Sequence, residues 1–285
     1  MKNIFRNNIS LIAVLLIVFH STAQQSKPGK SGYAPVNGSK IYYEVYGEGK
    51  PIVLLHGSFM TIGLNWGELI PQLSKNRKVI ALEMDGHGHS PLSNREFSYD
   101  SLASDVINAL KYLGVESTDV IGYSFGGTIA YAIATQYPKL VNRLVIISST
   151  YRYDGWQKEV RDVLHSMKPE FFTNTPLKAE YDKVAPDPNK WNAFVKKMLA
   201  LDKKEFNLGD DNIKNIKSPV LLIAGDNDGV DKQILFETYR LLGGGVFADM
   251  TGVPKSQLAI IPAQGHVSLM NQTQTILQFL NGFLN

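Results

Sequence analysis

The sequence contains no cysteine among its 285 residues. This absence excludes disulfides, thiolate metal sites, a cysteine nucleophile and the lipidated cysteine of a lipoprotein. A large net charge is missing too. The formal value is +3, and it falls to +1 on loss of the two positive charges of Lys2 and Arg6. Composition therefore gives no electrostatic case for binding nucleic acid or an anionic membrane surface.

The sequence also lacks an apolar run of membrane-spanning length at its N-terminus. The run Ile9 to Phe19 follows Lys2 and Arg6 and precedes Ser21-Thr22-Ala23. It is about half of the ~20 residues that a spanning helix requires, and small residues follow it where signal peptidase cleaves. We expect residues 1–23 to be a signal peptide cleaved after Ala23, with export to the periplasm or the extracellular space and no stable membrane anchor afterwards.

The rest of the chain predicts one α/β domain over residues 33–285, preceded by a flexible segment at 24–32. The 44% hydrophobic content of the whole sequence suffices for one large core. Apolar strands alternate with amphipathic helices, which is typical of a mostly parallel sheet flanked by helices. Residues 151–211 contain no apolar strand but two helical stripes around Trp156 and Trp191, with prolines between them. We interpret this segment as a helical cap over the strand ends.

The most informative stretch is Gly122-Tyr123-Ser124-Phe125-Gly126, which lies between an apolar strand and a helix. A strand-to-helix turn this sharp exposes its central serine, and the flanking glycines allow the neighbouring chain to come close. The turn also directs the Phe125 amide and the positive end of the helix at a bound oxyanion. Ser124 is therefore the predicted nucleophile.

A base and an acid are expected on loops that follow later strands, because in this architecture the order is serine, acid, histidine. Of six histidines, only His266 follows the last predicted strand. Asp228, after the penultimate strand, fits the acid best. The alternatives are Asp226 and Asp231 close by and Asp154 further away.

Three other histidines lie in loops that precede the serine. His56 ends a buried strand, and we expect it to pin its loop by hydrogen bonds, while the amide of Ser58 is the candidate second oxyanion donor. His87 and His89 are interpreted as part of a connecting turn, since no further ligands lie nearby to complete a metal site. Phe59, Tyr123, Trp156 and Trp191 are the predicted substrate-binding residues.

Together these positions resemble the α/β-hydrolase fold superfamily, in particular its serine-nucleophile, esterase-like members with a helical cap. The resemblance covers Tyr33 to Leu284. Its motifs are His56-Gly57, Gly86-His87-Gly88-His89-Ser90, Gly122-x-Ser124-x-Gly126, Gly225-x-x-Asp228 and Gly265-His266. Many relatives have an Asp where this chain has Glu83. Relatives that open epoxides or remove halides have an Asp as nucleophile, and Ser124 argues against both activities.

The resulting hypothesis is an exported carboxylic-ester hydrolase that acts on a small ester-like substrate through an acyl-enzyme, without metal or organic cofactor. Lactone or C–C bond hydrolysis or perhydrolysis with the same three residues is the alternative within enzymes. A catalytically silent binding protein on this scaffold is the alternative from another class. The fold hosts many chemistries and does not itself identify a substrate.

Overall fold

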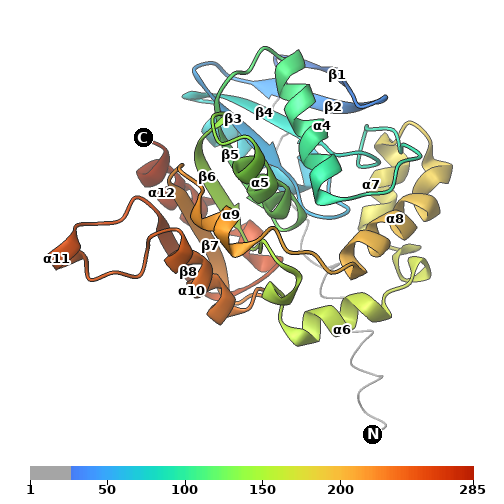
Figure 1. Cartoon of the computed structure of the whole chain (residues 1–285). Coiled ribbons are helices and arrows are strands. Elements are labelled where there is room, and N and C mark those ends of the chain that lie inside the picture. The colour runs from blue at the N-terminus through green and yellow to red at the C-terminus, as the bar shows by residue number, and fades with distance from the viewer. Residues whose placement is uncertain (1–26) are drawn as a thin grey trace, which may run out of the picture.

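A computed structural model describes residues 27–285 (Figure 1). The predicted signal peptide, its cleavage site and residues 24–26 lie outside the described residues. Across residues 27–285, no helix is both long enough and apolar enough to cross a membrane.

The described residues form an eight-stranded sheet in the order β1-β2-β4-β3-β5-β6-β7-β8. Strands β1 and β2 are antiparallel to their neighbours, and all pairs from β4 to β8 are parallel. The predicted α/β fold is thereby confirmed. The strands are β1 Lys30–Val36, β2 Ser39–Tyr46, β3 Lys50–Leu55, β4 Arg77–Glu83, β5 Thr118–Tyr123, β6 Val141–Ile147, β7 Val220–Asn227 and β8 Gln257–Gly265.

Helices cover both faces of this sheet, and the residues of the buried strands alternate between two cores. In β3, Val53 and Leu55 pack toward α4 and α5, whereas Ile52 and Leu54 pack toward α2, α3 and α12. This two-sided burial explains the unbroken apolar run of the strand. The helices are α2 Ile62–Trp66, α3 Ile70–Leu73, α4 Tyr99–Tyr112, α5 Phe125–Gln136, α9 Asp210–Lys214, α10 Lys232–Leu241, α11 Ala248–Thr251 and α12 Thr273–Leu284.

Between β6 and β7 the chain leaves the sheet and forms a group of helices to one side of it (Figure 1). This group occupies the place predicted for the cap. Its elements are η1 Tyr153–Gly155, α6 Lys158–Ser166, η2 Pro169–Phe172, α7 Pro176–Val184, η3 Pro188–Lys190 and α8 Trp191–Lys203.

The start of the domain differs from the sequence prediction. Residues 30–32 were expected to belong to a flexible segment, but they pair with Val45, Glu44 and Tyr43 as the first residues of β1. Their Lys, Ser and Gly side chains carry no β-strand signal, and backbone pairing with β2 decides the outcome. The predicted hairpin itself is confirmed, with positive φ at Asn37 (39°) and Gly38 (78°).

Candidate active site

Ser124 sits in a strained turn between β5 and α5. Its φ of 52° and ψ of −120° lie outside the regions that side-chain-bearing residues ordinarily adopt. The flanking glycines make the turn possible, because a Cβ on Gly122 would lie 2.3 Å from the Gly126 carbonyl oxygen and one on Gly126 would lie 2.2 Å from that of Leu55. The backbone therefore holds the Ser124 hydroxyl at the carboxyl end of the sheet, as predicted for an elbow.

Three side chains from three loops form a hydrogen-bonded chain at this point. The Ser124 Oγ lies 2.9 Å from His266 Nε2, and His266 Nδ1 lies 2.9 Å from Asp228 Oδ1. His266 follows the last residue of β8, and Asp228 follows the last residue of β7. The structure thus brings the predicted nucleophile, base and acid together. With the proton on Nδ1, the imidazole can accept the serine proton at Nε2.

The environment of Asp228 favours its ionised form. Burial alone would raise the pKa of this carboxyl, but the charge of His266 and hydrogen bonds from His266, Ser148 and the Val230 amide outweigh burial and lower the pKa to about 2. A fixed carboxylate with no surface exposure on its side chain is suited to orient His266 and to stabilise the imidazolium.

The alternative acids serve other partners. Asp226 accepts from the Gln264 amide at 3.1 Å, and Asp231 caps the start of α10 by accepting from the Gln233 and Ile234 amides. Asp154 pairs with Arg152 at 3.2 Å. None of the three has a hydrogen bond to His266 among the described residues, so the geometry singles out Asp228.

Several residues that sequence analysis did not assign complete the support around this chain. The Ser148 hydroxyl donates to Asp228 Oδ2, and Ser149 Oγ donates to the Ser124 carbonyl at 2.6 Å. The sequence feature that could have indicated them is the run Ser148-Ser149-Thr150. It places three hydroxyl side chains directly after a buried strand, and such side chains are mostly exposed in proteins.

Tyr123 occupies a different place from the one predicted. Its hydroxyl donates to the His266 carbonyl at 3.0 Å, and its buried ring stacks on the imidazole with 5.3 Å between centroids. The alternation of β5 directs this side chain to the core shared with α2 and α12, on the sheet face opposite α5. Tyr123 therefore positions His266 from behind and does not line the substrate side.

The two predicted oxyanion donors both lie beside the elbow. Phe125 is the first residue of α5, so its amide has no partner within the helix. Within the part of the chain that the structure describes, the Ser58 and Phe125 amides donate to no other group of the chain. Phe59 adopts a φ of 62°, which turns the backbone sharply next to Ser58. Both amides thus remain available to bind a developing negative charge.

His56 holds the loop that carries Ser58, as expected. Its Nε2 accepts from the Met84 amide at 3.1 Å, and its Nδ1 lies 2.8 Å from the Gly57 carbonyl oxygen. Burial lowers the pKa of His56 to about 4. A neutral, fully buried imidazole with both nitrogens engaged cannot exchange protons with a substrate, which agrees with a structural role.

The Gly86-to-Ser90 turn is organised by Glu83. Its carboxylate accepts from the amides of Ile62 and His89 and lies 2.9 Å from His89 Nδ1. Glu83 therefore makes the loop contacts itself, although many relatives have an Asp there. Residues 27–285 contain no cluster of three or more His, Asp or Glu side chains that could hold a metal ion.

Aromatic rings from the cap border the site. The Trp156 ring lies edge-on to His266 with 5.6 Å between centroids, and the Phe59 ring lies 4.8 Å from Phe172 of the cap. Both positions fit the predicted contact with substrate. Trp191 does not, because it is only 2% exposed and packs against Tyr181 inside the cap. Its helical stripe predicted burial correctly, and the buried face packs both against Tyr181 of the cap and against Phe59 and His87 of the sheet domain.

Comparison with known proteins agrees with the observed fold. The family model described as "alpha/beta hydrolase fold" matches residues 50–207. The chain is 38% identical over 106 residues to a 2-hydroxymuconate semialdehyde hydrolase of a Pseudomonas species, a match that covers 36% of this chain and 38% of that protein.

Two further similarities extend over nearly the whole domain. The chain is 26% identical over 258 residues to a 2-hydroxy-6-oxo-2,4-heptadienoate hydrolase of Pseudomonas putida, covering 84% of this chain and 90% of the relative. The solved structure of a meta-cleavage product hydrolase from Pseudomonas fluorescens superposes with a TM-score of 0.69 at 25% identity, covering 90% of this chain and 98% of that one.

Proposed function

Because this chain belongs to the α/β hydrolase fold family, we propose that it is an exported serine hydrolase that cleaves carboxylic esters. The observation that carries the proposal is the hydrogen-bonded chain from Ser124 through His266 to Asp228, set on a strained elbow. A hydroxyl positioned in this way can be deprotonated as it attacks, which is what acyl transfer requires.

The proposed reaction has two halves that use the same groups. Ser124 Oγ attacks the acyl carbon while its proton passes to His266 Nε2, and the amides of Ser58 and Phe125 bind the resulting oxyanion. Collapse of this intermediate breaks the ester bond, and the alcohol leaves with the proton from His266. Water then attacks the acyl-enzyme, gives a proton to His266, and the regenerated serine takes that proton back.

The surroundings of the serine favour a largely apolar acyl group. Phe59 and Trp156 are half-buried beside the site, whereas Phe125, the residue after the nucleophile, is buried and packs at 5.4 Å against the buried His87. Burial, and next the nearby His56, lower the pKa of His87 well below its usual value, so it adds no charge to this wall. Aromatic walls of this kind bind hydrocarbon and exclude water.

A second candidate is C–C bond hydrolysis, because the relative and the structure matched over most of the domain bear the names of such enzymes. A dienoate carries a carboxylate, and binding it in a buried site calls for a cation. At this end of the sheet the Arg152 guanidinium pairs with Asp154, Asp210 and Glu237, and Lys232 donates to the carbonyls of Asp228 and Val230. These cations already have partners, which favours an ester without a carboxylate.

A substrate panel separates the two candidates. We expect turnover of p-nitrophenyl esters of graded acyl length and little or no bleaching of a 2-hydroxy-6-oxo-dienoate. Ser124→Ala is the matched control and should abolish ester turnover while it melts near the wild-type temperature. Preferred turnover of the dienoate would replace the ester assignment with C–C hydrolysis. Turnover of neither class would favour a catalytically silent binding protein.

A further inference from the structure

The side chain of Phe59 connects the loop of residues 56–60 (the oxyanion loop) to the cap. Between ring centroids, Phe59 lies 4.8 Å from Phe172, 5.7 Å from Phe194 and 6.5 Å from Trp191. The first of these rings belongs to η2 and the other two belong to α8. The residue before Phe59 is Ser58, whose amide is one of the two oxyanion donors. The cap therefore contacts the immediate neighbour of an oxyanion donor.

Ser58 and Phe59 form the corner of a tight turn. The Met60 amide donates to the Gly57 carbonyl at 3.2 Å and closes the turn. Phe59 occupies the third position of the turn with a φ of 62°, and a positive φ at that position favours glycine or asparagine. A phenylalanine in this conformation is strained, and it persists only where its surroundings hold it. The cap rings that pack on its side chain are such surroundings.

The sheet domain fixes the start of this turn but not its corner. The Gly57 amide donates to Asn65 Oδ1 at 2.7 Å. Within residues 27–285, the amides of Ser58 and Phe59 donate to no group of the chain. The other oxyanion donor differs, because the Phe125 amide is held as the first residue of α5. The direction of the Ser58 N–H therefore depends on how the Phe59 side chain is packed.

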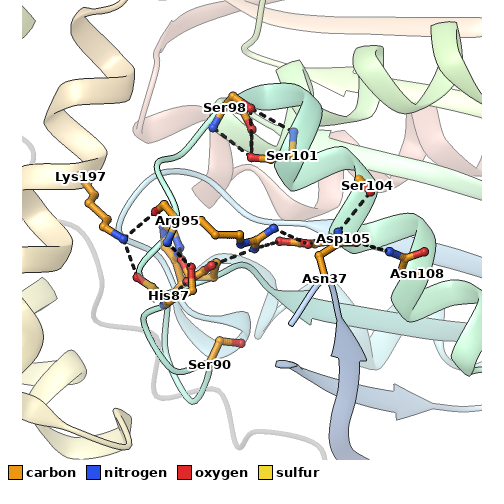
Figure 2. A network of polar contacts seen from close by, with 12 residues as sticks. Asn37, His87, Ser90, Arg95, Ser98, Ser101, Ser104, Asp105, Asn108 and Lys197 are labelled. Carbon is orange, nitrogen blue, oxygen red and sulfur yellow. Dashed lines mark hydrogen bonds and ion pairs between the residues drawn. The ribbon is translucent and has the colours of Figure 1, made fainter. Parts of the chain in front are cut away.

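Helix α8 is itself anchored to the sheet domain. Lys197 donates to the carbonyls of Ser93 and Arg95 (Figure 2). The Arg95 guanidinium in turn pairs with the buried carboxylates of Asp85 and Asp105. These contacts fix α8 in place, and with it two of the rings that contact the oxyanion loop.

We propose that Phe59 is a positioning residue through which the cap holds the Ser58 amide in its oxyanion-binding direction, so that acyl transfer at full rate requires the cap to be packed on the oxyanion loop. This inference rests on the proposed ester hydrolysis and adds a control of that same site. Loss of one oxyanion donor costs about 10²–10³ in kcat in subtilisin, so a change in the direction of one amide suffices to control turnover. The amide acts on the transition state of every ester, whatever its acyl length.

Two substitutions of Phe59 separate positioning from backbone preference and from substrate contact. Phe59→Gly suits the turn but removes the ring, whereas Phe59→Leu keeps an apolar side chain on which the cap can pack. The assay uses p-nitrophenyl acetate, whose short acyl group makes little contact with the Phe59 ring. We expect Phe59→Gly to lower kcat by about ten- to a hundredfold and Phe59→Leu to retain most of the activity.

Two simpler roles of Phe59 lead to different results in this assay. If backbone preference alone mattered, Phe59→Gly would be at least as active as the wild type. If Phe59 only contacted substrate, Phe59→Gly would raise KM for long-chain esters and leave kcat for the acetate ester unchanged. Either result would overturn the inference.

The second test alters the cap and leaves Phe59 in place. Phe172→Ala removes the ring at 4.8 Å; it should lower kcat for the acetate ester in the wild-type background and cause no further loss in Phe59→Gly. Phe171→Ala, at a 42% exposed position of the same short helix, is the matched control and should change nothing. Wild-type kcat in Phe172→Ala, or an equal loss in Phe171→Ala, would contradict the proposal even if Phe59→Gly failed to fold.

A boronic acid tests the oxyanion site without any ester. Propylboronic acid forms a tetrahedral adduct with a nucleophilic serine oxygen and places a boronate oxygen where the oxyanion would lie. Its dissociation constant, measured by calorimetry, should rise by about ten- to a hundredfold in Phe59→Gly and in Phe172→Ala, and stay unchanged in Phe171→Ala. Weakened boronate binding without ester turnover by the wild type would retain the positioning role and reject ester hydrolysis. Unchanged boronate binding in both variants would reject the positioning role.

Discussion

Replacing Asp228 by Asn tests how the acid supports His266. In the structure Asp228 Oδ1 accepts from His266 Nδ1 and from the Val230 amide at 3.2 Å, while Oδ2 accepts from the Ser148 hydroxyl and weakly from the Gly225 amide at 3.4 Å. If Asn placed its NH2 group at the Oδ1 position, that group and the Val230 N–H would be two donors facing each other, which is unfavourable. At the Oδ2 position it can donate to Ser148, whose hydroxyl then rotates to accept.

The second orientation keeps the Asn carbonyl toward His266 and therefore keeps the productive tautomer. What is lost is the negative charge beside the imidazolium. At a separation of about 4 Å and an effective dielectric constant of about 20, that charge is worth about 4 kcal/mol. We therefore expect Asp228→Asn to lower kcat by about a thousandfold. This is less than the roughly 10⁴-fold loss in a serine protease whose Asp→Asn change produces the wrong tautomer.

Ser148 makes this expectation specific to the present chain. Ser148→Ala alone removes one hydrogen bond from a carboxylate that keeps its other donors, and we expect about a tenfold loss or less. In the Asp228→Asn background it removes the acceptor that orients the amide, so the wrong tautomer becomes accessible. The combined loss should then exceed the product of the two single losses.

The assay is kcat for a short-chain p-nitrophenyl ester, with circular dichroism as a check of folding. Asp226→Asn is the control, since Asp226 binds the Gln264 amide and not His266. Near-normal turnover by Asp228→Asn, with the loss found in Asp226→Asn or Asp154→Asn, would refute the assignment of the acid. A combined loss no larger than the product of the single losses would refute the role given to Ser148.

Three further predictions follow from other parts of the chain. N-terminal sequencing of secreted material should begin at Gln24, and material that still begins at Met1 would favour an uncleaved anchor. Trp156→Ala should change the preference for acyl length more than the rate on the shortest ester. Trp191 is buried, so Trp191→Ala should instead destabilise the protein by about 3–5 kcal/mol in urea unfolding. Equal effects of the two variants on acyl preference would contradict the different roles given to the two tryptophans. Because the pKa of Asp228 falls from 3.8 to about 2 on folding, its ionisation stabilises the fold by about 2 kcal/mol at neutral pH, and this is lost as pH falls from about 4 toward 2. A stability difference between wild type and Asp228→Asn that does not shrink over that interval would contradict it.

The sequence predicted the elbow well because its determinants are local. Gly122 and Gly126 lie two residues from Ser124, and each is required by a backbone contact within or next to the turn. His266 and Asp228 were found because each directly follows a buried strand, and parallel strands bring their carboxyl ends to one edge of the sheet.

What the sequence did not reveal depends on three-dimensional packing. Ser148 reaches Asp228 because the backbone φ of Ser148 is 51°. A non-glycine residue rarely adopts this value, and nothing in the sequence around Ser148 predicts it. Strand alternation directs Tyr123 to the core on the sheet face opposite α5, which is why its prediction as a substrate-binding residue is wrong.

The central claim is that Ser124 is a nucleophile activated by His266, and covalent labelling tests it most directly. A fluorophosphonate probe, followed by peptide mass spectrometry, should modify Ser124 once per chain in the wild-type protein. Ser124→Ala should abolish labelling without a change in melting temperature, and His266→Ala should slow it severely, because the hydroxyl loses the base 2.9 Å away. Labelling at another residue, or ester turnover that persists in Ser124→Ala, would contradict the account.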